Sequence, residues 1–189
     1  MRHSYLSIRW SVLVLILFAF TSLPVAAQKK KPTPKTPPAP KVATSQCGVN
    51  GLTEAEQAEL VKDQNQERAK RNLAPLTWDC SLARYAQQWA NRGVFEHRVD
   101  SNYGENMFVA SAPSEPVQSA VKRWMSEEPN WTNKTATCAP GKFCNHYTQV
   151  MWKSTTKVGC GINRFGTVKW QVVLVCNYDP PGNEPGPAY

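Results

Sequence analysis

The most informative short stretch of this chain reads Cys144-Asn145-His146-Tyr147-Thr148-Gln149-Val150-Met151-Trp152. It combines a histidine and two aromatic side chains with three polar side chains that can form hydrogen bonds. Apolar and polar residues do not alternate in this stretch as they would in a strand, and the apolar residues do not recur at the spacing of one helix face. Such a mixture is typical of a loop or short helix that directs a side chain into a pocket.

The first 27 residues are typical of a secretory signal peptide. Arg2 and Arg9 provide the positive charge, residues 12–20 are apolar, and small residues at 24–27 predict cleavage after Ala27. The apolar run is short for a membrane span, so an uncleaved anchor is the less favoured alternative. We therefore expect a secreted, extracellular protein without a transmembrane segment in its mature form.

Residues 28–46 are rich in proline and lysine and contain no acidic residue. Such a composition cannot bury enough apolar surface to fold, so we expect a disordered linker. The net charge of +8 comes almost entirely from this linker and the signal peptide, because residues 47–189 hold 15 basic and 14 acidic residues. A nucleic-acid-binding domain would carry its positive charge on the folded part, so this class of function is disfavoured. The linker could instead hold the protein near an anionic wall or membrane surface.

Residues 47–189 have the length of one domain with a full core. All of the cysteines lie in this part of the chain, at Cys47, Cys80, Cys138, Cys144, Cys160 and Cys176. An even number behind a signal peptide predicts three disulfides in an oxidising compartment, but the spacing alone leaves their connectivity open. The spacings contain no paired CxxC units, which argues against a structural zinc cluster.

The hydrophobic pattern predicts helices followed by a β-hairpin. A capping box formed by Thr53 and Glu56 opens the first helix, which we expect to run to Arg71. The other predicted elements are a helix capped by Asp79 and running to Asn91, a helix that begins near Glu115, and a hairpin formed by residues 158–165 and 168–176. This order indicates an α+β domain with helices on both faces of a small sheet, followed by an irregular tail from about residue 180.

The mature chain would contain two histidines, His97 and His146, because His3 lies in the predicted signal peptide. Two neutral imidazoles brought together form a site for a divalent cation such as zinc or copper. Glu105, which we expect in a segment whose neighbours turn sharply, and Glu127 could complete the shell, orient the rings or hold a metal-bound water. The alternative is that these glutamates are solvated and the histidines have only a structural role.

Five motifs occur in the order seen in the CAP superfamily, which comprises the cysteine-rich secretory proteins, antigen 5 and the plant pathogenesis-related class 1 proteins. They are Glu96-His97, Gly104-Glu105-Asn106, Trp124-Met125-Ser126-Glu127, His146-Tyr147-Thr148-Gln149-Val150-Met151-Trp152 and Cys176-Asn177-Tyr178-Asp179-Pro180-Pro181-Gly182-Asn183. The match spans residues 52–183, and the chain resembles the short pathogenesis-related class 1 type because no second cysteine-rich domain follows.

This resemblance implies a disulfide-stabilised three-layer α-β-α sandwich with a broad central cleft. The family's cleft tetrad of two histidines and two glutamates falls on His97, Glu105, Glu127 and His146, and the family spacing Trp-x-x-Glu selects Glu127 over Glu128. In relatives the two histidines can bind a divalent cation such as zinc. Several members bind sterols or fatty acids.

The resemblance also implies the disulfides Cys138–Cys144 and Cys160–Cys176. The relatives' usual third pair has no counterpart here, which leaves Cys47–Cys80. The first helix carries Gln64-Asn65 where relatives often have His-Asn. Asn130-Trp131-Thr132 and Asn133-Lys134-Thr135 are formal glycosylation sequons that overlap too closely for both to be used readily.

Two classes of function remain. The favoured one is a secreted, monomeric binding protein whose partner is a sterol, a fatty acid, or an extracellular protein or surface. The alternative is a metal-dependent extracellular hydrolase in which Glu105 or Glu127 polarises a zinc-bound water. The chain has no His-Glu-x-x-His motif, and neither Ser126 nor Ser154 lies in a nucleophile elbow, so binding is favoured over catalysis.

Overall fold

The computed structural model describes residue 47, residues 51–165 and residues 169–189. The predicted signal peptide and linker lie outside the described residues, as do residues 166–167, which connect the two strands of the predicted hairpin. Within the described ranges, no helix has the length and apolar character needed to cross a membrane.

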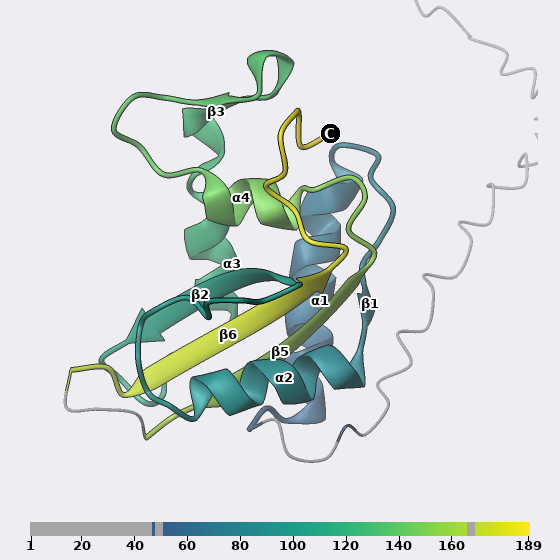
Figure 1. Cartoon of the computed structure of the whole chain (residues 1–189). Helices are drawn as coiled ribbons and strands as arrows, with labels where there is room; N and C mark the ends of the chain where they lie inside the picture. Colours follow the sequence, from purple (N-terminus) through teal and green to yellow (C-terminus); the bar gives the residue numbers. More distant parts are fainter. Residues whose placement is uncertain (1–46, 48–50, 166–168) are drawn as a thin grey trace, which may run out of the picture. The chain divides into compact units, whose positions relative to one another are not determined.

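The centre of the fold is a mixed sheet with the strand order β1-β5-β6-β2 (Figure 1). Its strands are β1 (Thr77–Trp78), β5 (Lys157–Asn163), β6 (Val172–Asp179) and β2 (Gly104–Ala110). β1 pairs in parallel with β5, whereas β5 with β6 and β6 with β2 are antiparallel. The β5–β6 pair is the predicted hairpin, although β6 begins and ends later than residues 168–176.

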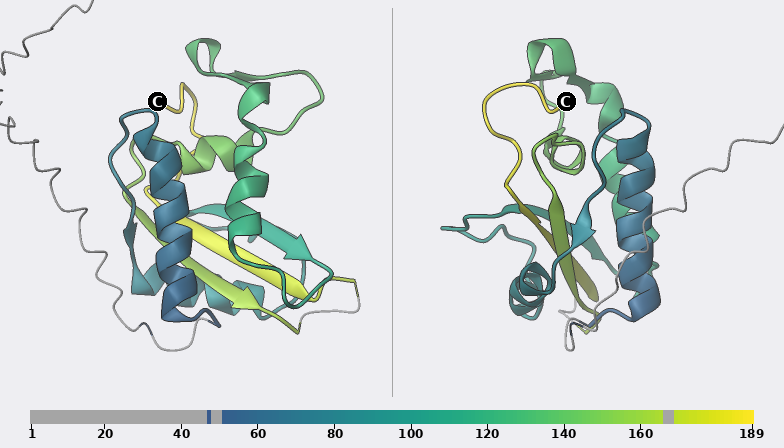
Figure 2. Two further views of the ribbon diagram at one scale, coloured as in Figure 1. Left: turned by 180° about the vertical axis from the view of Figure 1, so that it is seen from behind. Right: turned by 90° about the vertical axis from the view of Figure 1, so that its right-hand side faces the viewer.

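Helices cover both faces of the sheet, which is therefore the middle of three layers (Figure 2). Alternate residues of β6 point to opposite sides, as expected for a strand buried on both faces. Val173 and Val175 pack with Ala86 and Ala90 of α2 (Cys80–Ala90). Leu174, Cys176 and Tyr178 belong to the larger core, to which α1 (Glu54–Ala69), α3 (Gln118–Met125) and α4 (Asn145–Val150) contribute. The predicted α-β-α sandwich is confirmed.

Glycines in β5 allow α2 to lie directly against the sheet. A Cβ atom on Gly159 would stand 2.2 Å from the backbone nitrogen of Ala83, and one on Gly161 would stand 2.4 Å from Cα of Gln87. The side-chain amide of Gln87 forms two hydrogen bonds with the backbone of Ile162, each 2.9 Å long. Its nitrogen donates to the oxygen of Ile162, and its oxygen accepts the N–H of Ile162. The Gly-Cys-Gly sequence of β5 thus sets the distance between helix and sheet.

The helix boundaries follow local capping. The predicted capping box of Thr53 and Glu56 is present, and Asp79 accepts the backbone N–H groups of Ser81 and Leu82 at the start of α2. α3 begins at Gln118, later than expected, and it is preceded by a turn in which the backbone N–H of Glu115 donates to the oxygen of Ala112. The remaining short elements are η1 (Glu128–Asn130), β3 (Trp131–Thr132), η2 (Asn133–Thr135) and β4 (Thr137–Cys138). β3 and β4 form a small separate ribbon that the sequence analysis did not predict.

Disulfides and the hydrogen bonds of one buried arginine join segments that are distant in the sequence. Disulfides join Cys138 to Cys144 and Cys160 to Cys176, the pairs that the family resemblance implies, and Cys47 to Cys80, the pair that was left. The guanidinium of Arg68 is fully buried and donates only to backbone oxygens, at 2.8–3.0 Å. Its acceptors belong to Ala74, Val150, Trp152 and Thr155. Arg68 therefore ties α1 to the segment that leaves α4.

The tail after residue 180 has no regular structure, but it is anchored to the domain. Ala188 is fully buried, and its oxygen accepts the backbone N–H of Lys153 at 2.7 Å. The side-chain oxygen of Asn133 accepts the N–H groups of Ala188 and Tyr189 at 2.9 and 3.2 Å. The side-chain nitrogen of Asn133, to which a glycan would be attached, donates to the backbone oxygen of Tyr189, so a glycan at this sequon would disrupt that contact.

Candidate functional site

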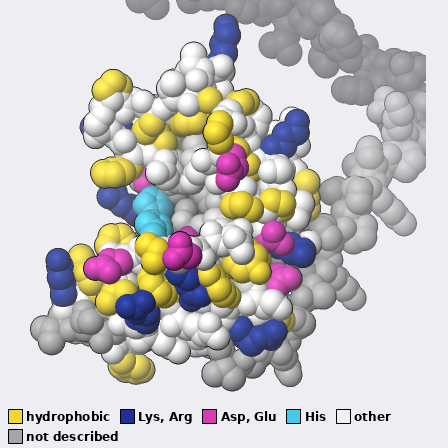
Figure 3. Space-filling view, in the orientation of Figure 1, with side chains coloured by type: hydrophobic (Ala, Val, Ile, Leu, Met, Phe, Trp, Pro, Cys, Tyr) yellow, Lys and Arg dark blue, Asp and Glu magenta, His cyan; other side chains and the backbone are white. Residues whose placement is uncertain are grey.

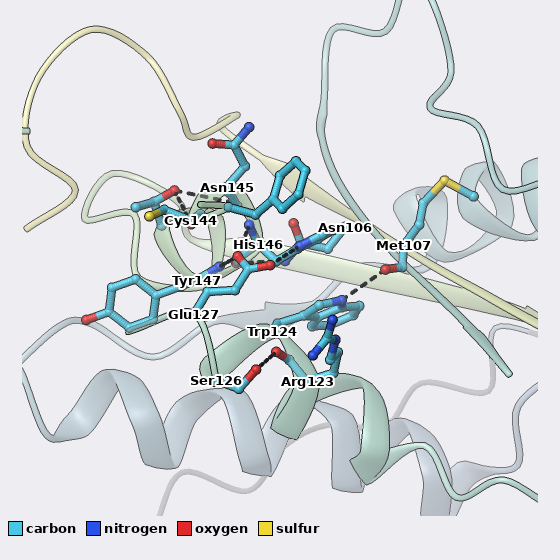
Figure 4. A network of polar contacts seen from close by, with 12 residues as sticks. Asn106, Met107, Arg123, Trp124, Ser126, Glu127, Cys144, Asn145, His146 and Tyr147 are labelled. Atoms are coloured by element: carbon cyan, nitrogen blue, oxygen red, sulfur yellow. Dashed lines mark hydrogen bonds and ion pairs between the residues drawn. The ribbon is translucent and has the colours of Figure 1, made fainter. Parts of the chain in front are cut away.

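The four predicted site residues come from four different segments that meet at one cleft. His146 is in the first turn of α4, and Glu127 lies two residues after the end of α3 (Figure 4). Glu105 is the second residue of β2, and His97 lies in the loop between α2 and β2. All four line one cavity of about 630 Å³. Turns and bends precede Gly104, as expected, but Gly104-Glu105-Asn106 itself opens a seven-residue strand that the sequence analysis did not predict.

Glu127 binds His146 through both carboxylate oxygens. Its Oε1 lies 2.6 Å from Nδ1 of the imidazole, and its Oε2 accepts the backbone N–H of His146 at 3.0 Å. The indole of Trp124 stacks on the same imidazole, with ring planes 14° apart. Glu128 points elsewhere and pairs with Arg71 at 2.7 Å. The ring of His146 is therefore held in position by a carboxylate and an aromatic face.

Glu105 makes a similar contact with His97. Its Oε1 lies 2.9 Å from Nδ1 of the imidazole and accepts the backbone N–H of Arg98 at 3.1 Å. Its Oε2 lies 3.4 Å from the side-chain nitrogen of Asn177. The carboxylate is buried, with 6% of the side chain exposed, whereas 63% of the His97 side chain is exposed. The imidazole of His97 is therefore exposed to solvent, whereas the carboxylate that holds it is buried.

The pKa values of His97 and Glu127 are shifted in the directions expected for carboxylate–imidazole contacts. The hydrogen bond to Glu105 raises the pKa of His97 above its usual 6.5, against a smaller opposing effect of burial. Burial alone would raise the pKa of Glu127, but the hydrogen bond and charge of His146 and two backbone N–H groups together lower it.

A chain of hydrogen bonds that the sequence analysis did not predict supports the cleft from inside the core. Asn106 donates to the backbone oxygen of His146 at 3.0 Å and lies 3.5 Å from the hydroxyl of Tyr178. Tyr178 in turn donates to Gln64 at 2.8 Å. Gln64 occupies the position where relatives often have histidine, and here it is fully buried. Asn106 and Tyr178 both belong to motifs identified in the sequence. Their contact could not be predicted from those motifs, because it depends on the register of the strands.

The walls of the cleft are largely apolar. Phe95, Met107, Val109, Trp124 and Phe143 line the same cavity as the four site residues. The exposed fractions of Phe95 and Phe143 are 49% and 77%, which is high for phenylalanine. Histidine side chains reach the surface beside hydrophobic ones in Figure 3. A second hollow of about 540 Å³ shares His97 and Glu105 and extends toward Asn183 and Glu184.

The chemistry of the site fits a weakly held cation. Nδ1 of each imidazole contacts a glutamate carboxylate, and no described residue forms a hydrogen bond with Nε2 of either ring. A carboxylate on one ring nitrogen fixes the tautomer in which the other nitrogen can bind a metal. Nowhere in the described ranges do three or more His, Cys, Asp or Glu side chains form a group that could hold a metal ion. Two imidazole nitrogens are thus the protein ligands that the cleft offers.

The comparisons with known proteins agree on one family. The model of the "Cysteine-rich secretory protein family" (CAP) matches residues 61–178. A pathogenesis-related protein of the PR-1 type from Sambucus nigra is 38% identical over 132 residues, which cover 68% of this chain and 78% of the relative. Pathogenesis-related protein 1A1 from Solanum lycopersicum is 42% identical over 122 residues, which cover 63% of this chain and 68% of the relative.

Solved structures show the same fold. NaASP2, crystallised with Zn2+, aligns with a TM-score of 0.63 at 23% identity and covers 75% of this chain and 88% of that one. BmVAL-1 aligns with a TM-score of 0.61 at 26% identity, and the alignment covers 72% of this chain and 82% of that one.

Proposed function

This chain belongs to the cysteine-rich secretory protein (CAP) family, and from that premise we propose that it is a secreted binding protein with a divalent cation in its cleft. His97 and His146, which both line the cleft, would hold the cation. Zinc is the cation that imidazole ligands suit best among those common outside cells. Secretion is part of the proposal, because three disulfides are typical of an oxidising compartment.

One observation carries this proposal: each histidine is held at Nδ1 by a glutamate whose other contacts are also satisfied. Glu127 accepts two backbone N–H groups besides its contact with His146, and Glu105 accepts one from Arg98. Such carboxylate–histidine pairs orient metal ligands and raise their basicity. NaASP2 was crystallised with Zn2+, but at 23% identity it shows the fold alone, so the argument rests on these four side chains.

A site with two protein nitrogens leaves most of the coordination sphere of the cation to other molecules. A cation held there could also take a carboxylate, phosphate or imidazole from a partner as a ligand. The cation would therefore contribute to ligand recognition. Sterols, fatty acids and extracellular protein or surface ligands are the partner classes considered, and the apolar walls of the cleft suit all of them.

No specific observation favours the hydrolase alternative. A water-polarising base needs a carboxylate that is free to take a proton. Both glutamates are instead bound to Nδ1 of a histidine, and hydrogen bonds to the ionised form hold the pKa of Glu127 below its usual value. The glutamates therefore serve as supports for the rings.

Zinc titration followed by nuclear magnetic resonance of the histidine rings tests the proposal. We expect the Nε2 signals of His97 and His146 to shift together at one stoichiometric point, while both rings keep a proton on Nδ1. Loss of the proton from Nδ1, or shifts at one ring only, would contradict the proposed arrangement. Chelation should reverse the shifts.

A further inference from the structure

The hollow of about 540 Å³ that shares His97 and Glu105 with the cleft has walls of a different kind. Its lining residues come from the segment 97–105, from Gln149 of α4 and from residues 181–184 of the tail. The volume is within the roughly 300–1,000 Å³ that small-molecule sites occupy. Aromatic and aliphatic side chains wall the cleft, whereas polar side chains predominate in the hollow. A ligand of the hollow would therefore be polar and different from a ligand of the cleft.

Two glycines bring the walls of the hollow against the side-chain amide of Gln149. A Cβ atom on Gly104 would stand 2.0 Å from Oε1 of Gln149, and one on Gly182 would stand 2.9 Å from its Nε2. The backbone N–H of Gly182 also donates to Oε1 of Gln149 at 2.9 Å. The start of β2 and the tail are therefore held at a fixed separation around this amide.

The amide of Gln149 has a donor to spare. Gln149 is 1% exposed, and its Nε2 donates to the hydroxyl of Thr155 at 3.4 Å, which is a long bond. An amide nitrogen carries two hydrogens, and no described residue accepts the second one. Buried polar groups nearly always have a partner. Because Gln149 lines the hollow, an oxygen atom of a ligand can accept this hydrogen.

Internal hydrogen bonds fix the sides of the hollow. In the tail, Asn183 accepts the hydroxyl of Thr148 at 2.5 Å and donates to the backbone oxygen of Asn145 at 3.0 Å. In the loop before β2, the hydroxyl of Ser101 accepts the N–H of Tyr103 at 3.1 Å and donates to its oxygen at 3.2 Å. The hollow is thus formed before a ligand binds, which lowers the entropic cost of binding.

Several polar side chains in this rigid frame are free to contact a ligand. The amide of Asn102, the hydroxyl of Tyr103 and the carboxylate of Glu184 line the hollow, and none of them forms a hydrogen bond with a described residue. An amide and a hydroxyl both donate and accept, whereas an ionised carboxylate only accepts. The hollow therefore offers donors and acceptors side by side.

The charges around the hollow offset one another. Its charged lining residues are Arg98, Glu184 and the hydrogen-bonded pair of Glu105 with His97. The guanidinium of Arg98 lies 3.5 Å from the ring centroid of Tyr85 and donates to the backbone oxygen of Tyr85 at 2.8 Å. One arginine thus faces one unpaired glutamate, and the lining selects neither an anion nor a cation. It suits an uncharged ligand whose groups both donate and accept.

We propose that this hollow binds an uncharged saccharide. Each hydroxyl of a sugar donates one hydrogen bond and can accept others, which matches the mixed lining. Gln149 and Asn102 donate to sugar oxygens, and Glu184 accepts from a sugar hydroxyl. The inference adds a second site to the proposed binding role of the cleft and assigns it to a saccharide of an extracellular surface. Saccharide binding itself does not need the cation.

The double variant Asn102→Ala, Glu184→Ala removes two of the ligand-binding groups. Both side chains are exposed and form no hydrogen bond with a described residue, so the fold should be unaffected. Val99→Ala, Asp100→Asn is the matched control, because these exposed residues belong to the same loop as Asn102 but do not line the hollow.

The test is binding of the purified protein to an array of immobilised neutral and acidic oligosaccharides, with a chelator present throughout. We expect at least one neutral oligosaccharide to bind the wild type and the control equally. It should bind the double variant about tenfold more weakly, because two hydrogen bonds are lost. Titration of the wild type with this oligosaccharide, followed by nuclear magnetic resonance, should shift the side-chain amide signals of Gln149 and the N–H signal of Gly182.

The proposal is overturned if no neutral oligosaccharide binds, if the double variant binds as well as the wild type, or if the Gln149 and Gly182 signals do not move. Binding that is confined to acidic oligosaccharides and abolished by salt would also overturn it, and would assign the contact to surface charge. If the double variant does not fold, the Gln149 signals decide alone. Because the chelator removes any bound cation, failure of this test and failure of the zinc titration are distinguishable.

Discussion

Glu127 holds His146 at two points, because one carboxylate oxygen lies 2.6 Å from the ring Nδ1 and the other accepts the backbone N–H of the same residue at 3.0 Å. The acid therefore fixes both the ring and the start of α4. A contact of this kind controls which ring nitrogen is presented to the cleft.

Replacing Glu127 with glutamine should weaken zinc binding while leaving the fold in place. Glutamine keeps the size of the side chain but loses the charge that stabilises the Nδ1-protonated ring, and loss of such a partner typically costs about 10–100-fold in metal affinity. Calorimetric titration measures the change. Glu128→Gln is the control, since Glu128 pairs with Arg71 outside the cleft. Equal losses in the two variants would contradict the role assigned to Glu127.

Zinc affinity should fall as the pH drops through the raised pKa of His97. The contact with Glu105 favours the protonated imidazole, and a protonated ring cannot bind the metal. Glu105→Gln should therefore return the pKa of His97 toward 6.5 in a ring titration by nuclear magnetic resonance. An unchanged His97 pKa in that variant would show that Glu105 is not its cause.

The same pairs predict opposite pH dependences of stability. The raised pKa of His97 means that its pair with Glu105 contributes stability fully below pH 6.5, and this is lost as the pH rises through the folded-state pKa. The lowered pKa of Glu127 means that its contribution is present above pH 4.5 and is lost as the pH falls through the folded-state pKa. Denaturant titrations of Glu105→Gln and Glu127→Gln against pH measure both windows. Parallel curves for the variants and the wild type would contradict the prediction.

Arg68→Met should destabilise the domain by about 3 kcal/mol or more, because it leaves buried backbone oxygens without donors. Burial lowers the pKa of Arg68 to about 10, so the guanidinium remains charged at neutral pH and its bonds are charge-assisted. Arg71→Met is the control, since the ion pair of Arg71 is exposed and its loss should cost less than about 1 kcal/mol. Guanidinium chloride unfolding compares the two variants, and similar midpoints would rule out a special role for Arg68.

Removing the disulfide between Cys160 and Cys176 should cost about 2–5 kcal/mol, because this bridge joins the two central strands in the core. The Cys138–Cys144 bridge spans only six residues, so its loss should cost less stability. It ends one residue before α4, however, and we expect its loss to weaken zinc binding at His146. Paired alanine variants, compared by thermal unfolding and zinc titration, separate these effects. The reverse order of the two stabilities would contradict the argument.

The sequence predicted those parts of the fold that depend on neighbouring residues. The capping box at Thr53 and the cap at Asp79 set the starts of α1 and α2, and the β-branched runs gave the β5–β6 hairpin. β2 was missed because its polar first residues do not alternate with apolar ones. β1 was missed because two residues carry no periodicity.

The sequence predicted which residues form the candidate site but not which of them contact one another. The identities of His97, Glu105, Glu127 and His146 followed from their motifs, whereas the pairing of each histidine with one glutamate depends on how four segments meet. Arginine is seldom fully buried, so nothing in the composition indicated that Arg68 lies under α4. The hollow lined by Gln149, the start of β2 and the tail could be recognised only from the structure, because three distant segments form it.

The most direct test of the central claim is a calorimetric zinc titration of the purified protein beside its His97→Ala, His146→Ala double variant. We predict one site of micromolar affinity in the wild type, no binding in the double variant, and near-identical thermal unfolding of the two proteins without metal. Equal zinc binding in both proteins, or none in either, would contradict the assignment of the cleft as a cation site.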